Sequence, residues 1–285
     1  KPMDLPQLLG RLGLSDYIAF DFETTGLNPK DDRIIEIAAI KFVKGNPIDR
    51  FVKLINPGRS IDPFITDITG ISDAMVRNKP LESDIIDEFL EFLTDLPLVA
   101  HNISFDKSFL DALCERFKKP TKINTLFDTL QLSRTFLFFH PVHDLGSISE
   151  YFGFSSAGSH RAEKDTENCG VIFQRLIHEA ASYPLKTITK LLDIIRSCNA
   201  PNLQLYIKLA DELKRSGNLK SGLSESIIEK PIFDNVYEND GKNDISTFNS
   251  NNVFSSKGAL ADVLENYEER PSQIDYCAEI LKIIS

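Results

Sequence analysis

The 285-residue chain contains no uninterrupted run of ~18 apolar residues, which is the length that a membrane-spanning helix requires. It also does not open with a basic segment followed by an apolar one, as a secretory leader does. Neither a membrane protein nor an exported one is therefore indicated. We expect a cytoplasmic protein with no membrane contact.

Cysteine and positive charge are scarce as well. The four cysteines include no CxxC pair and no histidine at zinc spacing, so reduced thiols are expected rather than disulfides or a zinc site: Cys114, Cys169, Cys198 and Cys277. Lysine and arginine number 32 against 42 aspartates and glutamates, a net charge of −10. This balance argues against a broad basic face that grips duplex nucleic acid, so any nucleic-acid contact should be local.

What the sequence does have is a regular alternation of apolar runs of strand length with stretches of helical period, which predicts a layered α/β fold. The first three strands should form a meander, with residues 43–49 as a turn. Strands are expected at 17–22, 34–43, 51–56, 97–102 and near 124–129. Helices are expected at 82–96, at 106–119, and from Leu130, Leu145 and Ala162.

Three parts follow one another along the chain. Residues 1–183 are expected to form the first domain, because the regular pattern ends near Glu179. Residues 184–258 should be a helical extension, broken at Pro201, that leads into a flexible linker rich in Asn, Ser, Asp and Gly. Residues 259–285 regain a helical period and are expected to begin another domain.

Two carboxylates, Asp21 and Glu23, stand at the end of the first apolar strand, in the stretch IAFDFETTG at 18–26. Side chains at i and i+2 of a strand point to the same face, so both acids should project into one space. Close carboxylates repel each other, and a divalent cation between them would relieve the repulsion. The alternative is an exposed edge where both acids meet water.

Two further segments carry acids. In HNISFD, Asp106 follows a buried-type strand, and the alternative there is an ordinary helix cap. In HRAEKD, His160 and Asp165 stand five residues apart at the start of a helix, and the alternative is a charged helix face. The three segments are informative as an ordered set.

Together these segments resemble the three motifs of the DnaQ-like superfamily of 3′→5′ exonucleases, in its histidine-containing DEDDh branch. The resemblance covers residues 15–180 and departs from the pattern at no motif position. It implies the ribonuclease-H-like fold, a central mixed five-stranded sheet flanked by helices, here with a helical C-terminal extension. It also implies that two Mg²⁺ or Mn²⁺ ions are held by Asp21, Glu23, Asp106 and Asp165, with His160 as the general base.

The resemblance further implies substrate contacts at the exit of the first strand. In the family, Thr24, Thr25 and Gly26 border the terminal sugar, and Leu27 lies near the base. The alternative is a hairpin turn in which Gly26 supplies a positive φ. Asn102 is a further candidate for a substrate contact, or it satisfies local backbone. Three other polar residues are expected to be structural, Asp128 as a helix cap and His140 and His143 as loop residues.

The C-terminal stretch 254–284 resembles the segment that leads into DinG-type helicases, and its residues Tyr267 to Gln273, YEERPSQ, fit the motif of that segment. The alternative is an unrelated terminal helix. No glycine-rich phosphate loop ending in Lys-Ser or Lys-Thr occurs in the chain. Residues 259–285 are therefore expected to be the start of a truncated helicase domain, which the full-length protein would carry in cis.

The expected function is metal-dependent 3′→5′ hydrolysis of single-stranded DNA, or of RNA, releasing nucleoside monophosphates. Within the enzyme class, the alternative is a polymerase-associated proofreading or repair exonuclease. Outside it, the alternative is a module that binds nucleic-acid ends and recruits a partner.

Overall fold

The computed structural model describes residues 4–121, 123–154, 162–196, 200–216 and 255. The chain divides into two compact units, Lys1–Ile227 and Ile228–Ser285, and all the elements below belong to the first unit. The predicted helicase-like segment at 259–285 lies outside the described residues, and so does the predicted linker at 229–258 apart from Ser255.

A five-stranded mixed sheet forms the centre of the first unit, in the order β3-β2-β1-β4-β5. The first three strands form an antiparallel meander, and the last two run parallel to β1. The strands are β1 (Tyr17–Thr24), β2 (Ile34–Val43), β3 (Asn46–Leu54), β4 (Leu98–Ala100) and β5 (Leu126–Asp128). This topology confirms the predicted mixed five-stranded sheet.

The turn between β2 and β3 is shorter than the predicted segment 43–49. Only Lys44 and Gly45 form it, with φ values of 52° and 76°, while Val43 already pairs with Asn46. Two residues of positive φ give a turn whose twist matches that of the strands it joins. β3 therefore begins at Asn46, five residues earlier than the sequence predicts, and Pro47 is tolerated because β3 is an edge strand.

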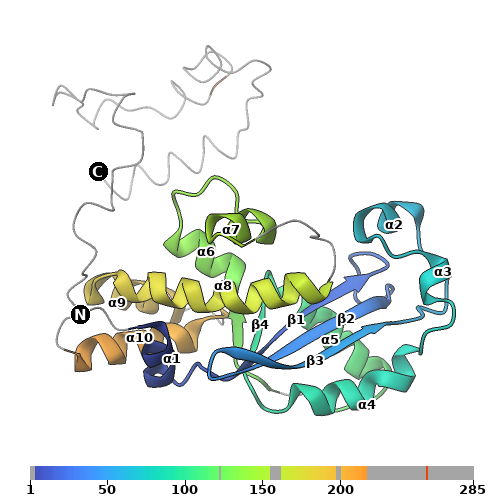
Figure 1. Ribbon diagram of the computed structural model, residues 1–285, viewed down its shortest axis with the longest axis horizontal. Coiled ribbons are helices and arrows are strands. Elements are labelled where there is room, and N and C mark those ends of the chain that lie inside the picture. Colours follow the sequence, from blue (N-terminus) through green and yellow to red (C-terminus); the bar gives the residue numbers. More distant parts are fainter. Residues whose placement is uncertain (1–3, 122, 155–161, 197–199, 217–254, 256–285) are drawn as a thin grey trace. The chain divides into compact units, whose positions relative to one another are not determined.

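Helices cover both faces of the sheet, with α8 along one face and α4 and α5 along the other (Figure 1). α5 begins three residues earlier than predicted, and α1 is a short helix that was not predicted. The helices are α1 (Leu5–Leu12), α2 (Pro63–Thr69), α3 (Asp73–Val76), α4 (Glu82–Leu93), α5 (Ile103–Arg116), α6 (Thr129–Phe136), α7 (Leu145–Tyr151), α8 (Ala162–Ser182), α9 (Leu185–Arg196) and α10 (Leu203–Arg215). None of the described helices is long and apolar enough to cross a membrane.

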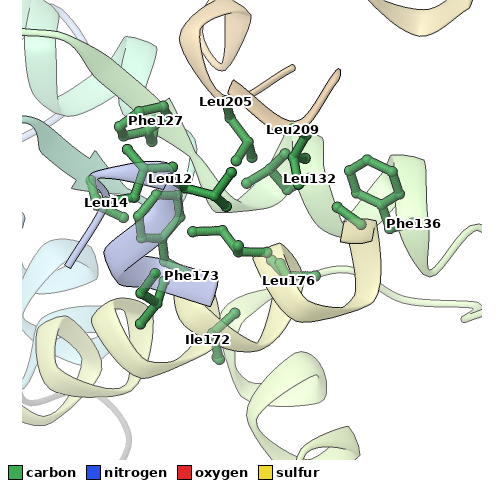
Figure 2. Close-up of a cluster of buried hydrophobic side chains, with 14 of the residues drawn as sticks. Leu12, Leu14, Phe127, Leu132, Phe136, Ile172, Phe173, Leu176, Leu205 and Leu209 are labelled. Atoms are coloured by element: carbon green, nitrogen blue, oxygen red, sulfur yellow. The ribbon is translucent and has the colours of Figure 1, made fainter. Parts of the chain in front are cut away.

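Alternation along β1 divides the core into two layers. Tyr17 and Ala19 pack on the α8 side, whereas Ile18 and Phe20 pack on the side of α4 and α5. Part of the α8-side cluster is shown in Figure 2, where α1, β5, α6, α8 and α10 all contribute side chains: Leu12, Leu14, Phe127, Leu132, Phe136, Phe173, Leu176, Leu205 and Leu209. Every residue of β1 from Tyr17 to Phe20 is buried, so the strand is anchored from both sides.

The two helices predicted as an extension contribute to this same core. Ile188 of α9 and Leu209 of α10 are buried in the α8-side cluster. Asn202, the residue before α10, is buried beside β5, where its side-chain oxygen accepts from the Asp128 backbone N–H at 2.9 Å. Its amide nitrogen donates to the Asp128 carbonyl at 3.2 Å. α10 is therefore tied to the free edge of the sheet.

Candidate active site

The two acids of β1 lie where the strand leaves the core. Asp21 and Glu23 continue the alternation of Tyr17 and Ala19, so both side chains project from the face that α8 covers. Glu23 pairs with Glu36 of β2, and the register shifts immediately after Glu23. The acids therefore occupy one face at the end of a strand that is rigidly held along its length.

Asp106 reaches the same strand from the opposite side of the sheet. It is 1% exposed, and its Oδ1 accepts a hydrogen bond from the backbone N–H of Phe22 at 3.0 Å, between the two β1 acids. The residue that precedes α5 is Asn102, so Asp106 does not cap the helix. The capping alternative for Asp106 is wrong, because α5 begins three residues before it. The Asp106 carboxylate instead accepts a hydrogen bond from the neighbouring strand.

Asp165 lies in the first turn of α8, which packs across β1 and β2. Its negative charge contributes to raising the pKa of Asp21 and of Glu23. The fourth acid therefore acts on the same space as the acids of β1. His160 lies outside the described residues.

Mutual repulsion and burial perturb the protonation of these acids. Burial, followed by the charges of Asp165 and Glu36, raises the pKa of Asp21 from 3.8 to about 7. Burial, followed by the charge of Asp21 and those of two further acids, raises the pKa of Glu23 from 4.5 to about 8. Burial above all also raises the pKa of Asp106, although the Phe22 N–H opposes this effect. Without a cation, these groups resist being ionised together.

The donor set has the chemistry that a hard divalent cation requires, since all four groups are carboxylates. Three separate elements, β1, α5 and α8, supply them. Across the described part of the chain, however, no group of three His, Cys, Asp or Glu side chains is arranged to hold a metal ion as it stands. Mutual repulsion of the carboxylates in the absence of an ion opposes their closer approach.

Glu36 is a fifth acid that the sequence analysis did not select. It is 6% exposed on β2, beside Glu23, and its charge contributes to raising the pKa of both β1 acids. The available signal was a single charged residue within the apolar run IIEIAAI. Only the strand register, which the sequence does not specify, places that residue opposite Glu23.

The loop after β1 is held by a compact hydrogen-bond network. The Thr24 hydroxyl donates to the Gly26 carbonyl at 2.6 Å, and the Thr25 hydroxyl donates to Asp32 at 3.0 Å. The other oxygen of Asp32 accepts from the Asn28 N–H at 2.9 Å. The threonine side chains therefore set the shape of this loop.

Gly26 does not supply a positive φ, so that part of the hairpin alternative is wrong. Its requirement for glycine has a different cause, because a Cβ at this position would overlap the carboxylate of Asp32. Leu27, which follows, is 84% exposed. An apolar side chain held out beside the acids is available to contact a ligand.

Asn102 adopts a left-handed conformation, with a φ of 70°, between β4 and α5. Its backbone N–H donates to Asp128 at 3.2 Å, and its exposed side chain accepts from the Ser104 hydroxyl at 3.1 Å. Asp128 also accepts from the N–H groups of Leu130 and Gln131 at the start of α6, which confirms its predicted role as a helix cap.

His101, which precedes Asn102, joins this edge of the sheet to the loop between α6 and α7. Its Nε2 lies 2.9 Å from the carbonyl oxygen of His143, and its Nδ1 lies 2.9 Å from the hydroxyl of Thr129. A carbonyl oxygen can only accept, so Nε2 donates. Burial lowers the pKa of His101, which favours a neutral ring whose Nδ1 accepts from Thr129.

The sequence model of the exonuclease family (RNase_T) matches residues 18–173, more than half of the chain. The chain belongs to the exonuclease family. This membership confirms the prediction of an enzyme of the 3′→5′ exonuclease class. The matched range includes all five motif residues, Asp21, Glu23, Asp106, His160 and Asp165.

Curated relatives of this exonuclease include PolC-type DNA polymerase III proteins. That of Caldanaerobacter subterraneus is 32% identical over 218 residues, which is 75% of this chain and 16% of the relative. That of Streptococcus pneumoniae is 40% identical over 171 residues, which is 60% of this chain and 12% of the relative. The chain thus spans only a small part of the length of these relatives.

Among solved structures, two of Escherichia coli exonuclease I share the fold. A zinc-bound complex with single-stranded DNA has a TM-score of 0.54 at 19% identity, over 62% of this chain and 43% of that one. A complex with an oligonucleotide has a TM-score of 0.52 at 19% identity, over 63% of this chain and 45% of that one. At this identity the likeness concerns the fold, and it confirms the predicted ribonuclease-H-like architecture.

Proposed function

We propose that the chain is a metal-dependent 3′→5′ exonuclease that removes nucleoside monophosphates from the 3′ end of single-stranded DNA. The observation that carries the proposal is the meeting of carboxylates from β1, α5 and α8, whose mutual repulsion and burial raise the pKa of Asp21 to about 7 and that of Glu23 to about 8. Protein that only bound phosphate would gain nothing from gathering negative charge there, since the acids repel phosphate as well.

Asp21, Glu23, Asp106 and Asp165 would hold two Mg²⁺ or Mn²⁺ ions. When bound, such ions neutralise charge on the attacked phosphate and acidify the attacking water. Asp106 keeps its place through the Phe22 N–H, so one ligand is fixed relative to both β1 acids before any ion binds. His160 would accept the proton of the attacking water, a role suited to the ordinary histidine pKa of ~6.5.

The terminal nucleotide would lie against the loop after β1. Thr24 and Thr25 keep this loop in shape, Gly26 would border the sugar, and the exposed Leu27 would contact the base. Asn102 would contact the substrate from the start of α5, where its side chain is exposed. The net charge of −10 favours local contacts with one strand over an extended grip on a duplex.

The deciding experiment is digestion of a 5′-labelled single-stranded DNA oligonucleotide with Mg²⁺, Mn²⁺ or EDTA. We expect a ladder that shortens from the 3′ end, requires the metal, and is absent with the Asp106→Ala variant. The same assay with an RNA strand measures whether the enzyme prefers DNA or RNA. If wild-type protein that is folded by circular dichroism left both strands intact in every metal, the proposal would fail.

Two larger proteins could contain this exonuclease. The resemblance of residues 267–273 to DinG-type proteins supports a helicase in cis, whereas the PolC-type relatives support a polymerase-associated proofreading role. Native protein isolated through an antibody against this chain distinguishes the two. ATPase activity stimulated by single-stranded DNA would indicate the helicase, and incorporation of deoxynucleotides would indicate the polymerase.

A module that binds nucleic-acid ends without cleaving them is the candidate from outside the enzyme class. It predicts binding of a 3′ end that survives removal of metal, and no hydrolysis in its presence. The raised pKa values argue against it, because carboxylates are costly to gather where no cation is to be bound.

A further inference from the structure

Exposed aromatic residues lie in and beside the loop that joins α6 to α7, whose place in the fold is seen in Figure 1. Phe138, Phe139 and Tyr151 are 60%, 51% and 43% exposed. Phe139 lies between the other two rings, with centroids 5.7 Å from Phe138 and 6.1 Å from Tyr151, and the His140 ring lies 5.5 Å from Tyr151. We call these four residues the aromatic platform. Large apolar rings grouped in water are typical of a binding surface.

His101 connects the loop between α6 and α7 with the sheet beside the candidate active site. His101 Nε2 donates to the carbonyl of His143, in the same loop as the platform. Val99 of β4 pairs with Ala19 of β1 in parallel, and His101 and Asp21 each follow this pair by two residues, so both come at the same end of the sheet. The loop is thus fixed beside the strand end that carries the acids.

Charge near the aromatic platform is mixed. Burial, followed by the effects of His140 and Arg134, lowers the pKa of His143, which places the Arg134 cation close to the loop. Two acids also border it, since Asp144 caps α7 from the same loop and Glu179 acts on the pKa of Tyr151. Phosphate groups would therefore gain little here, and a ligand would have to bind through flat, uncharged faces.

We propose that the aromatic platform stacks the bases of a single strand whose 3′ end occupies the carboxylate site. This inference rests on the proposed function and adds the place where the rest of the strand binds. Base stacking on aromatic rings tolerates any sequence, because every base has a π-face. The platform therefore increases affinity for strands long enough to reach it, without reading their sequence.

The absence of tryptophan from the chain permits a direct binding test. Phe139→Trp introduces a single indole into the aromatic platform, and Ile48→Trp introduces one at an exposed position of β3 near the end of the sheet opposite the acids. In EDTA, which prevents cleavage, we expect oligodeoxythymidylates to quench the platform tryptophan and leave the Ile48→Trp control unchanged. Because stacking dominates, the apparent Kd should depend only weakly on salt.

Kinetics test the same inference independently. Replacing Phe138 and Phe139 together by alanine should raise KM for a long oligonucleotide about tenfold or more, leaving kcat unchanged. Hydrolysis of p-nitrophenyl thymidine 5′-monophosphate, which is too short to reach the platform, should be unchanged. Phe139→Tyr keeps an aromatic ring and should retain the wild-type KM. Ile48→Ala also removes an exposed apolar side chain, but away from the platform, so it should leave KM unchanged. Unchanged thermal unfolding would show that the exposed rings are not structural.

The outcomes separate this inference from the proposed function. If wild-type protein hydrolysed neither substrate, the proposed function would fail, while quenching in EDTA would still decide whether strands bind at the platform. No quenching, or an unchanged KM in the double variant of an active enzyme, would overturn the inference. Shielding of the Phe139→Trp indole from acrylamide in the free protein would overturn it as well, because a segment of the chain itself would then cover the platform.

Discussion

Protonation is the residue-scale property that sets the candidate site apart from an ordinary acidic surface. Asp106 is almost fully buried, and its carboxylate accepts a hydrogen bond from the Phe22 N–H. A buried carboxylate is costly to ionise unless hydrogen-bond donors or a cation offset the loss of water. The site is therefore expected to exchange protons for metal ions, which has consequences for both stability and rate.

We expect the metal-free protein to lose stability as the pH rises. In the folded state the pKa of Asp21 is about 7 and that of Glu23 about 8, above the ~4 of both groups in an unfolded chain. The folded state therefore binds more protons, and the free energy of unfolding should fall between about pH 4 and pH 8. Thermal unfolding in EDTA at pH 5, 6, 7 and 8 measures this.

Addition of Mg²⁺ should reverse that trend, because the ion takes the place of the protons and binds only the folded site. The gain in Tm should be larger at pH 8 than at pH 5. Asp106→Asn, which removes one of the carboxylates with a raised pKa, should flatten the pH dependence in EDTA. A Tm in EDTA that rose steadily from pH 5 to pH 8 would contradict the account of the raised pKa values.

His160→Ala should lower the rate of cleavage by ~100-fold or more, since a general base contributes at about this scale. Metal affinity, measured by calorimetry, should remain near that of the wild type, because the four carboxylates are intact. Asp106→Ala is the matched comparison, in which metal affinity and cleavage should be lost together. Wild-type rates in the His160 variant would show that another group accepts the proton.

The motif acids could be found from the sequence, because three short segments in order carry them and strand periodicity places Asp21 and Glu23 on one face. The role of Glu36 and the contacts of His101 could not be predicted from the sequence. Their positions depend on strand register and on a loop that returns to the sheet, and neither is encoded in a local pattern. The role of Gly26 was missed for the same reason, since its close neighbour, Asp32, is brought back by the turn.

At the scale of elements, the predictions succeeded where the hydrophobic period was long and uninterrupted. β2 was predicted with its observed bounds, 34–43, whereas the start of β3 was missed because Gly45 and Pro47 indicate a longer turn than the two residues used. α5 begins at Ile103 because Asn102 can adopt a left-handed conformation at its start. Such local backbone choices follow from tertiary contacts rather than from the period of the apolar residues.

The close packing of α8 against the sheet requires a glycine at position 170. Gly170 lies against the ring of Phe42, and a Cβ there would overlap that ring. We expect Gly170→Ala to destabilise the protein by about 1–3 kcal/mol through overpacking. It should also lower activity, because α8 carries Asp165 in its first turn. Chemical denaturation and the oligonucleotide assay measure the two effects.

Gly10→Ala in α1 is the control for that substitution. No atom beyond the helix's own nearby backbone lies within 4 Å of a Cβ at this position, and the residue is in the last turn of the helix. Alanine there should stabilise by about 0.5–1 kcal/mol and leave activity unchanged. Destabilisation by both variants to the same extent would show that backbone flexibility, and not the Phe42 contact, is decisive.

For the whole molecule, the position of α9 and α10 determines where the first domain can be cut. Ile188, Leu205 and Leu209 are buried in the cluster that includes Phe136 and Leu176. The predicted boundary at residue 183 remains a proposal. We expect a chain ending at 183 to expose this apolar surface and to unfold at a markedly lower temperature than a chain ending at 216.

Leu209→Ala tests the same contact without removing any element, and it should cost about 2–5 kcal/mol. Ile48→Ala, an exposed position, should cost less than about 0.5 kcal/mol. Equal stability of the two shortened chains would show that the domain is complete at residue 183 and that α9 and α10 are an accessory.

The side-chain amide of Asn202 has a consequence for how copies of the protein behave at high concentration. Free sheet edges can recruit a strand from another molecule, which is a route to aggregation. At β5 the amide of Asn202 takes the hydrogen bonds of Asp128 that an incoming strand would need, and at the other edge Pro47 has no N–H to offer. At these two positions, therefore, the edges offer fewer hydrogen-bonding groups to a strand from another molecule.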